Sequence, residues 1–110
     1  MEKFVRGDVV VVPFPFSNLT ASKPRPAFVV TQLDGDDVIL CQITTRPRSD
    51  RYSIPLSSTD FSTGSLPQPS SIRPNRLFTA DSNIIIRRAG KLAQEKIDEV
   101  IDRIINIVQS

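Results

Sequence analysis

Apolar residues in the first half of the chain form short runs rich in β-branched side chains, which is typical of strands. Residues 9–12 are four consecutive valines after Gly7-Asp8, and they predict a first strand that leads into a proline-stiffened loop. Residues 26–33 and 37–44 predict a second and a third strand. Asp34-Gly35 between them is a strong signal for a two-residue hairpin turn. The second and third strands are therefore expected to pair.

The second half of the chain begins less regularly. Residues 52–56 are short and contain a proline, which suits an edge strand. Residues 57–71 are rich in Ser, Thr, Gly and Pro and predict an irregular excursion with at most one helical turn, near Asp60-Phe61. Strands are expected to resume at residues 77–80 and 84–88. Gly90 is then expected to break the chain.

The last segment has apolar residues at helical spacing, and it predicts one amphipathic helix from about Gln94 to Val108. The stripe consists of Ile97, Val100, Ile101, Ile104, Ile105 and Val108. Five or six short strands with one helix are too few for two full sheets. We therefore expect one domain over residues 1–110, mostly β with a C-terminal helix, folded as a small, strongly curved antiparallel barrel that the helix covers.

Composition limits the chemistry. The chain has 110 residues, no His and one Cys. The absence of His excludes a Ser-His-Asp or Cys-His nucleophile system and the commonest zinc ligand sets. The single cysteine, Cys41, makes no internal disulfide, so a reducing cytoplasm is the expected compartment. We recognise no secretory leader or membrane-spanning run in the sequence, and we expect no cofactor and no metal.

Positive charge is concentrated in the middle of the chain. The formal net charge is only +2, but ten of the fourteen basic residues are arginine. Between Thr44 and Arg88, seven arginines stand against three aspartates. The planar guanidinium suits phosphate, so this excess favours a polyanionic partner, although scattered arginines also solubilise a small domain.

The hairpin predicts one contact between distant residues. If Asp34 and Gly35 are the two loop residues and no bulge intervenes, opposed residue numbers sum to 69, which places Arg25 directly opposite Thr44. Lys23, Thr45 and Arg46 lie beside them at the open ends of the same strands. Arginine and hydroxyl groups in this arrangement are able to hold a phosphoryl group and stabilise its developing charge. Ordinary strand-entry and strand-filling roles for these residues remain the alternative.

Several stretches together resemble one known family, the MazF/PemK-type toxins of bacterial type II toxin-antitoxin systems. The resemblance covers nearly the whole chain, and its order and spacing are more specific than any single stretch. The matching stretches are Gly7-Asp8-Val9-Val10-Val11-Val12-Pro13-Phe14, Lys23-Pro24-Arg25-Pro26-Ala27-Phe28-Val29-Val30, Ile43-Thr44-Thr45, Asp60-Phe61, Gly64-Ser65-Leu66, Ser70-Ser71-Ile72-Arg73-Pro74 and Gly90-Lys91-Leu92.

The resemblance implies a small SH3-like β-barrel, a homodimer, that cleaves single-stranded RNA without a metal through 2′-hydroxyl attack to leave a cyclic phosphate. It places the family's catalytic roles on Arg25 and Thr44. It also implies a cognate acidic antitoxin as partner, and DNA binding in the complex with that antitoxin. Lys23, Thr45, Arg46, Arg73 and Asn75 are our candidates for RNA contacts.

Two positions depart from the family pattern. Some relatives have an aspartate two residues after the arginine that matches Arg73, and this chain has Asn75 there. Many relatives also carry a glutamate in the loop before the Arg-Pro motif, whereas residues 17–22 contain no charge. A guanidinium is a poor general base, so the acceptor of the 2′-hydroxyl proton is left open between phosphate oxygens and water. A catalytically silent barrel that binds RNA or a protein through the same groove is the alternative function.

Overall fold

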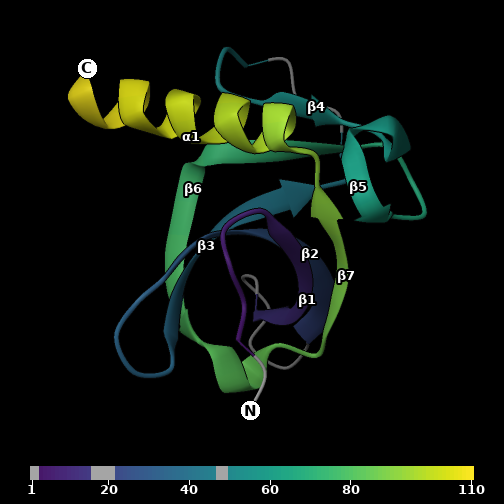
Figure 1. Ribbon diagram of the computed structural model, residues 1–110, viewed down its shortest axis with the longest axis vertical. Helices are drawn as coiled ribbons and strands as arrows, with labels where there is room; N and C mark the ends of the chain where they lie inside the picture. The colour runs from purple at the N-terminus through teal and green to yellow at the C-terminus, as the bar shows by residue number, and fades with distance from the viewer. Residues whose placement is uncertain (1–2, 16–21, 47–49) are drawn as a thin grey trace.

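Seven strands, two short 3-10 turns and one helix make up the part of the chain that the computed structural model describes, residues 3–15, 22–46 and 50–110 (Figure 1). In chain order they are β1 (Asp8–Pro15), β2 (Ser22–Gln32), β3 (Asp37–Thr44), β4 (Ile54–Leu56), η1 (Ser58–Asp60), β5 (Phe61–Gly64), β6 (Ser70–Asp81), η2 (Ser82–Ile84), β7 (Arg87–Leu92) and α1 (Gln94–Gln109). No helix within these ranges is long and apolar enough to cross a bilayer.

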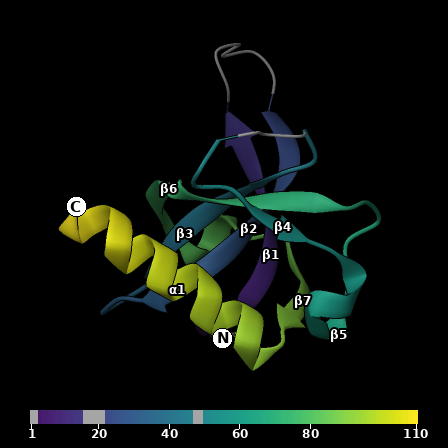
Figure 2. The ribbon, with the colours of Figure 1, turned by 90° about the horizontal axis from the view of Figure 1, so that it is seen from above.

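All seven strands belong to one antiparallel sheet in the order β4-β6-β3-β2-β1-β7-β5. The sheet curls strongly, so that β6, β3, β2, β1 and β7 follow one another around a ring in Figure 1, and α1 runs across one side of the sheet in Figure 2. The short strand β4 lies at an edge, as its proline predicts. The expected fold class, mostly β with a curved antiparallel sheet and a C-terminal helix, is confirmed.

The two faces of the sheet bury different apolar clusters because successive strand residues point to opposite sides. The first cluster lies between the sheet and α1 and contains Phe28, Cys41, Ile43 and the helix residues Ile97 and Val100. The second lies on the other face and is built from Phe4, Val10, Val12, Ala27, Val29, Val38 and Leu40. Each central strand is therefore buried on both sides, which explains the unbroken run of valines in β1.

The hairpin between β2 and β3 differs from its prediction in two ways that cancel. The Leu33 N–H donates to the Asp37 carbonyl oxygen at 2.9 Å, so the loop spans residues 34–36, with Gly35 at φ 75°. The prediction of a two-residue loop is therefore wrong. A bulge between Val29 and Thr31 then shifts the pairing by one residue. Beyond the bulge the opposed residue numbers again sum to 69, as in Ala27 opposite Gln42.

Several sequence-based boundaries are wrong: β2 begins at Ser22 rather than at residue 26, and β6 begins at Ser70 rather than at residue 77. Residues 57–71 are not wholly irregular, because they contain β5 and the first residues of β6. Most of the expected strand 84–88 is instead the turn η2 and a connection, and β7 begins at Arg87. Gly90 lies inside β7 rather than breaking the chain: a Cβ there would come within 2.5 Å of the Thr63 carbonyl oxygen, so glycine lets β5 pair closely with β7.

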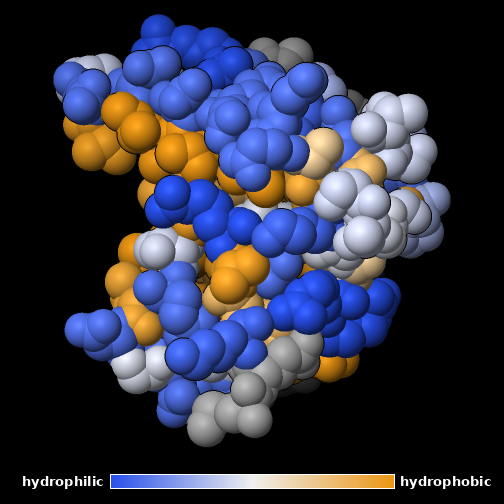
Figure 3. All heavy atoms as spheres, in the orientation of Figure 1, coloured by the Kyte–Doolittle hydropathy of each residue, from blue (hydrophilic) through white to orange (hydrophobic). Residues whose placement is uncertain are grey.

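The predicted helix is confirmed, but its apolar stripe is only partly covered. Ile97, Val100 and Ile104 are buried against the sheet. Toward the C-terminus, Ile105 and Val108 are 44% and 72% exposed, and Leu77 of β6 is also exposed. In Figure 3, hydrophobic spheres gather along the underside of the C-terminal half of α1. The sheet therefore leaves the C-terminal part of the stripe uncovered.

Candidate active site

On the sheet face that carries the second apolar cluster, the side chains of β2 change from apolar to positively charged toward the start of the strand. Val29 and Ala27 are buried in that cluster. The next residues of β2 on the same face are Arg25, which is half-buried, and Lys23, which is exposed. The Nε atom of Arg25 is shielded from solvent, so the guanidinium is anchored at the sheet rather than extended freely into water.

On the same face, the residues of β3 and β6 that lie across from this end of β2 are also polar. Gln42 is opposite Ala27 on one side and Arg73 on the other, and Thr44 is opposite Ser71 of β6. Continuing the β2–β3 register by two residues in each strand places Arg25 level with Thr44 on one face, as the sequence predicts. We call Lys23, Arg25, Gln42, Thr44 and Arg73 together the basic end of the sheet.

Thr44 is the last residue of β3 and presents a hydroxyl whose orientation is fixed. The residue is 8% exposed, and its Oγ1 accepts a hydrogen bond from the Arg46 backbone N–H at 3.1 Å. Because this bond uses a lone pair of the oxygen, the hydroxyl proton remains able to donate to an acceptor such as a phosphate oxygen. The predicted neighbours Thr45 and Arg46 are both exposed where the chain leaves the strand.

Arg73 is a nearly buried cation. Its side chain is 9% exposed, and its Nη2 lies 3.6 Å from Oδ2 of Asp50, on the segment that follows β3. Asn75 lies in a bulge, because Cys41 is opposite Leu77 while Gln42 is opposite Arg73, which leaves residues 74–76 outside the pairing. Asn75 is exposed there.

Sequence reasoning missed two residues of this region. Gln42 follows from the same register that paired Arg25 with Thr44, because it is the residue opposite Ala27, so the signal for it was present. Asp50 carried no such signal. Its approach to Arg73 depends on the course of the chain after β3 and on the bulge in β6, neither of which a pairing rule predicts.

The basic end offers charge and hydrogen-bond donors rather than a base. Asp50 is the carboxylate that pairs with it among the described residues, and hydrogen bonds from the backbone N–H groups of Ser53 and Tyr52 lower its pKa below the ordinary value. Within the same described ranges, no three His, Cys, Asp or Glu residues gather as a metal would require. Guanidinium and hydroxyl donors arranged in this way suit an anion such as phosphate.

Cys41 lies behind this site on the helix-covered face. It is fully buried, and its Sγ donates to the Arg73 carbonyl oxygen at 2.9 Å. Burial raises the pKa of the thiol to about 12, although the positive charge of Arg73 lowers it somewhat. Packing without redox chemistry, the role expected from the sequence, agrees with this environment.

We expect the Cys41 thiol of the native protein to react with a disulfide reagent at pH 8 roughly 10³-fold more slowly than an exposed thiol, because so little of it is ionised. The measurement is the rate of colour release from such a reagent with and without denaturing urea. Equal rates in the two conditions would contradict the burial described above.

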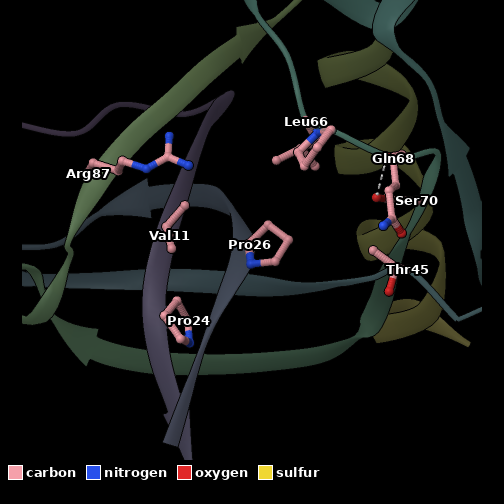
Figure 4. Close-up of a pocket in the computed structure, with 9 residues that line it drawn as sticks. Val11, Pro24, Pro26, Thr45, Leu66, Gln68, Ser70 and Arg87 are labelled. Carbon is pink, nitrogen blue, oxygen red and sulfur yellow. Dashed lines mark hydrogen bonds between the residues drawn. The ribbon is translucent and has the colours of Figure 1, made fainter.

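Figure 4 shows a pocket of about 310 Å³ that is lined by Pro24 and Pro26, the two neighbours of Arg25 in β2. Val11, Pro24 and Pro26 line one wall, and Leu66, Gln68, Ser70 and Thr45 approach from the other elements. The side chain of Arg87 points toward it from β7. Pro24 and Pro26 alternate with Arg25 along β2, so they point to the opposite face of the sheet. Thr45 lines the pocket together with these prolines and is therefore not on the face of Arg25.

Comparison with known proteins identifies one protein family and several solved structures with the same fold. A family model described as the PemK-like, MazF-like toxin of type II toxin-antitoxin systems matches residues 5–108. No curated protein matches the chain in sequence.

Solved structures with the same fold share little sequence with the chain. An endoribonuclease in complex with its cognate antitoxin, from a mycobacterial species, has a TM-score of 0.77 at 13% identity and covers 97% of this chain and 96% of its own. The toxin MazF-mt6 of Mycobacterium tuberculosis has a TM-score of 0.73 at 19% identity, with 93% and 96% covered. A MazE-MazF complex from Deinococcus radiodurans has a TM-score of 0.77 at 13% identity, with 96% and 95% covered.

Proposed function

The chain belongs to the PemK-like, MazF-like toxins of type II toxin-antitoxin systems, and on that premise we propose that it is an endoribonuclease of the cytoplasm that cleaves single-stranded RNA. The observation that carries this proposal is the basic end of the sheet. There, the β2–β3 register continued by two residues beyond Ala27 and Gln42 brings Arg25 and Thr44 to one face of the sheet, and the buried cation Arg73 lies opposite Gln42 on the neighbouring strand β6. Related structures are described as endoribonucleases, which supports the same activity.

The proposed reaction is an internal transfer at one phosphodiester. The 2′-oxygen attacks phosphorus, the bond from phosphorus to the 5′-oxygen breaks, and a 2′,3′-cyclic phosphate and a 5′-hydroxyl are left. Negative charge builds on the phosphoryl oxygens, where Arg25 stabilises it and the Thr44 hydroxyl donates a hydrogen bond. Lys23, Arg46 and Arg73 bind neighbouring phosphates, and Thr45 and Asn75 contact flanking nucleotides.

Arg25 is not the group that accepts the 2′-hydroxyl proton in this reaction. A guanidinium stays protonated at any working pH, so it donates hydrogen bonds and does not accept the 2′-hydroxyl proton. Asp50 is unsuited to the task because its lowered pKa makes it a weak base. The proton therefore passes to a phosphate oxygen or to water, and the leaving 5′-oxygen gains a proton from solvent.

Partners follow from the surface as well as from the family. We infer a homodimer and a cognate acidic antitoxin, and the exposed apolar residues near the end of α1 provide a surface on which another chain is able to pack. Structures of similar proteins are described as complexes with an antitoxin, which supports this inference.

The test is to incubate the purified protein with a long RNA in the presence of EDTA and to map the new 5′ ends. We expect cleavage at defined sites with 5′-hydroxyl ends. A matched oligonucleotide with a single 2′-deoxy sugar at the cut position should bind with similar affinity and resist cleavage, because it lacks the attacking oxygen. Cleavage of the deoxy substrate at the same position would contradict the proposed reaction.

One observation favours a second function, an RNA-binding barrel without catalysis. Asp50, the carboxylate that pairs with the basic end among the described residues, has a lowered pKa, which makes it a weaker general base than an ordinary carboxylate. A barrel that only binds would retain both oligonucleotides with similar affinity and leave both intact, so the same experiment separates the two functions.

A further inference from the structure

Arg73 requires a counter-charge, because burial of an unpaired cation is strongly unfavourable. Its side chain is 9% exposed, and its Nε is buried and has no hydrogen-bond partner among the described residues. The Asp50 carboxylate is the acid that pairs with it there. Without this carboxylate, the guanidinium would be drawn out of the sheet toward water.

Asp50 is itself held in place on two sides. Its Oδ1 accepts hydrogen bonds from the backbone N–H groups of Tyr52 at 2.9 Å and Ser53 at 2.8 Å, so the carboxylate closes a turn of its own chain. Its Oδ2 is thereby left to face Arg73.

The turn is also tied to the helix. The Nη1 group of Arg103, on α1, donates hydrogen bonds to the carbonyl oxygens of Arg51 and Tyr52, both at 3.1 Å. A fixed carboxylate therefore faces a buried guanidinium, and the guanidinium is opposite Gln42 in the basic end.

We propose that Asp50 is a positioning residue for catalysis, which holds the Arg73 guanidinium opposite Gln42, on the sheet face that carries Thr44, so that it faces the RNA phosphate. This inference rests on the proposed function. Asp50 does not touch the RNA; it acts through Arg73. Besides binding a neighbouring phosphate, an Arg73 guanidinium held in this position also stabilises the negative charge that increases at the cut site as the reaction proceeds. Loss of such an interaction lowers kcat more than it raises KM.

The variant Asp50→Asn isolates this charge. Asparagine keeps a side-chain oxygen that accepts from Tyr52 and Ser53 and is itself favoured in such turns, so the turn is retained and only the negative charge is removed. Asp34→Asn is the matched control, because it removes the same charge from the exposed hairpin loop at the far end of β2 and β3.

Kinetics of RNA cleavage provide the first test. We expect Asp50→Asn to lower kcat about tenfold with KM changed by less than about twofold, since coupled contacting pairs commonly account for effects of this size. Asp34→Asn should leave both constants unchanged. In an Arg73→Ala background, Asp50→Asn should cause no further loss, because its partner is already absent.

Three kinetic results would overturn the inference: equal kcat for Asp50→Asn and Asp34→Asn, a gain in kcat or in RNA affinity, or an undiminished loss in the Arg73→Ala background. A gain would mean that Asp50 competes with RNA phosphate for Arg73. An undiminished loss would mean that Asp50 acts through another group. If Asp50→Asn fails to fold, Asp50→Ser, whose hydroxyl also caps a turn, replaces it in the same series.

A second readout does not depend on cleavage. The buried Nε–H of Arg73 should give a slowly exchanging signal in 15N-resolved NMR of the unaltered protein, and this signal should exchange faster in Asp50→Asn but not in Asp34→Asn. Unchanged exchange in Asp50→Asn would overturn the positioning role. If the unaltered protein cleaves no RNA, the proposed function fails, and the exchange experiment still decides whether Asp50 holds Arg73.

Discussion

Replacing Arg25 with alanine is expected to reduce RNA cleavage by about 10³-fold or more, because a positioned cation that meets the charge of a phosphoryl transition state commonly contributes that much. Arg25 follows Val29 and Ala27 on the same face of β2, and its Nε is shielded from solvent, so its guanidinium is held against the sheet before RNA binds. Such preorganised charge needs little rearrangement when the transition state forms.

The measurement is the single-turnover rate on a short RNA that contains one mapped cut site. Arg6→Ala is the matched control, because Arg6 is exposed and donates from Nε to the Val30 carbonyl at 2.7 Å, near the other end of β2. It removes the same charge and should leave the rate within about twofold, as is usual for surface sites remote from the chemistry. A rate for Arg25→Ala equal to that of Arg6→Ala would remove Arg25 from the mechanism.

Phe28→Ala is expected to lower the free energy of unfolding by about 3–5 kcal/mol, the usual cost of removing a buried aromatic side chain. Phe28 is fully buried in the cluster between the sheet and α1, and it is opposite Val9 on one side and Cys41 on the other. A cavity at this position touches three central strands and the helix packing at once, so the surroundings have little freedom to collapse into it. The loss is large relative to the roughly 5–15 kcal/mol that stabilises a typical domain.

Urea unfolding measures this change, at one protein concentration for all variants, since association of copies in the native state adds apparent stability. Ile86→Ala is the control, because that side chain is 56% exposed and its truncation should change the free energy of unfolding by less than about 1 kcal/mol. A similar small change for Phe28→Ala would mean that the first cluster relaxes around the missing ring.

Local pattern predicted the parts of the fold that depend on one strand or one helix. The helix was placed within one residue at its end because its apolar stripe recurs over four turns. The strand β5 was missed because Phe61, Ser62, Thr63 and Gly64 have no alternation of their own, and they are held in the sheet by pairing with β7. Gly90 was misread for the same reason, because its role is to admit a neighbouring strand.

Prediction of the candidate site had a similar limit. Arg25 and Thr44 are linked by a predicted register that the structure shows as far as Ala27 opposite Gln42, because the longer loop and the bulge shift the pairing in opposite directions. Arg73 was chosen on composition and resemblance, and its burial and its pairing with Asp50 depend on long-range packing. The bulge at residues 74–76, which sets the level of Arg73 against Gln42, has no signal in local hydrophobicity.

The bulge at Val30 also determines which variations of the hairpin the protein can tolerate. Strand residues take sides by parity, so an odd number of residues gained or lost between Arg25 and the hairpin tip exchanges the two faces, whereas an even number restores them. With Pro24 and Pro26 on one side of β2 and Arg25 on the other, a one-residue deletion at the bulge would turn the guanidinium toward the pocket and a proline toward Thr44. A one-residue change in the length of the hairpin loop that the bulge offsets would leave Arg25 on the same face of the sheet as Thr44. The bulge at Val30 therefore keeps the candidate site independent of small length changes in the loop.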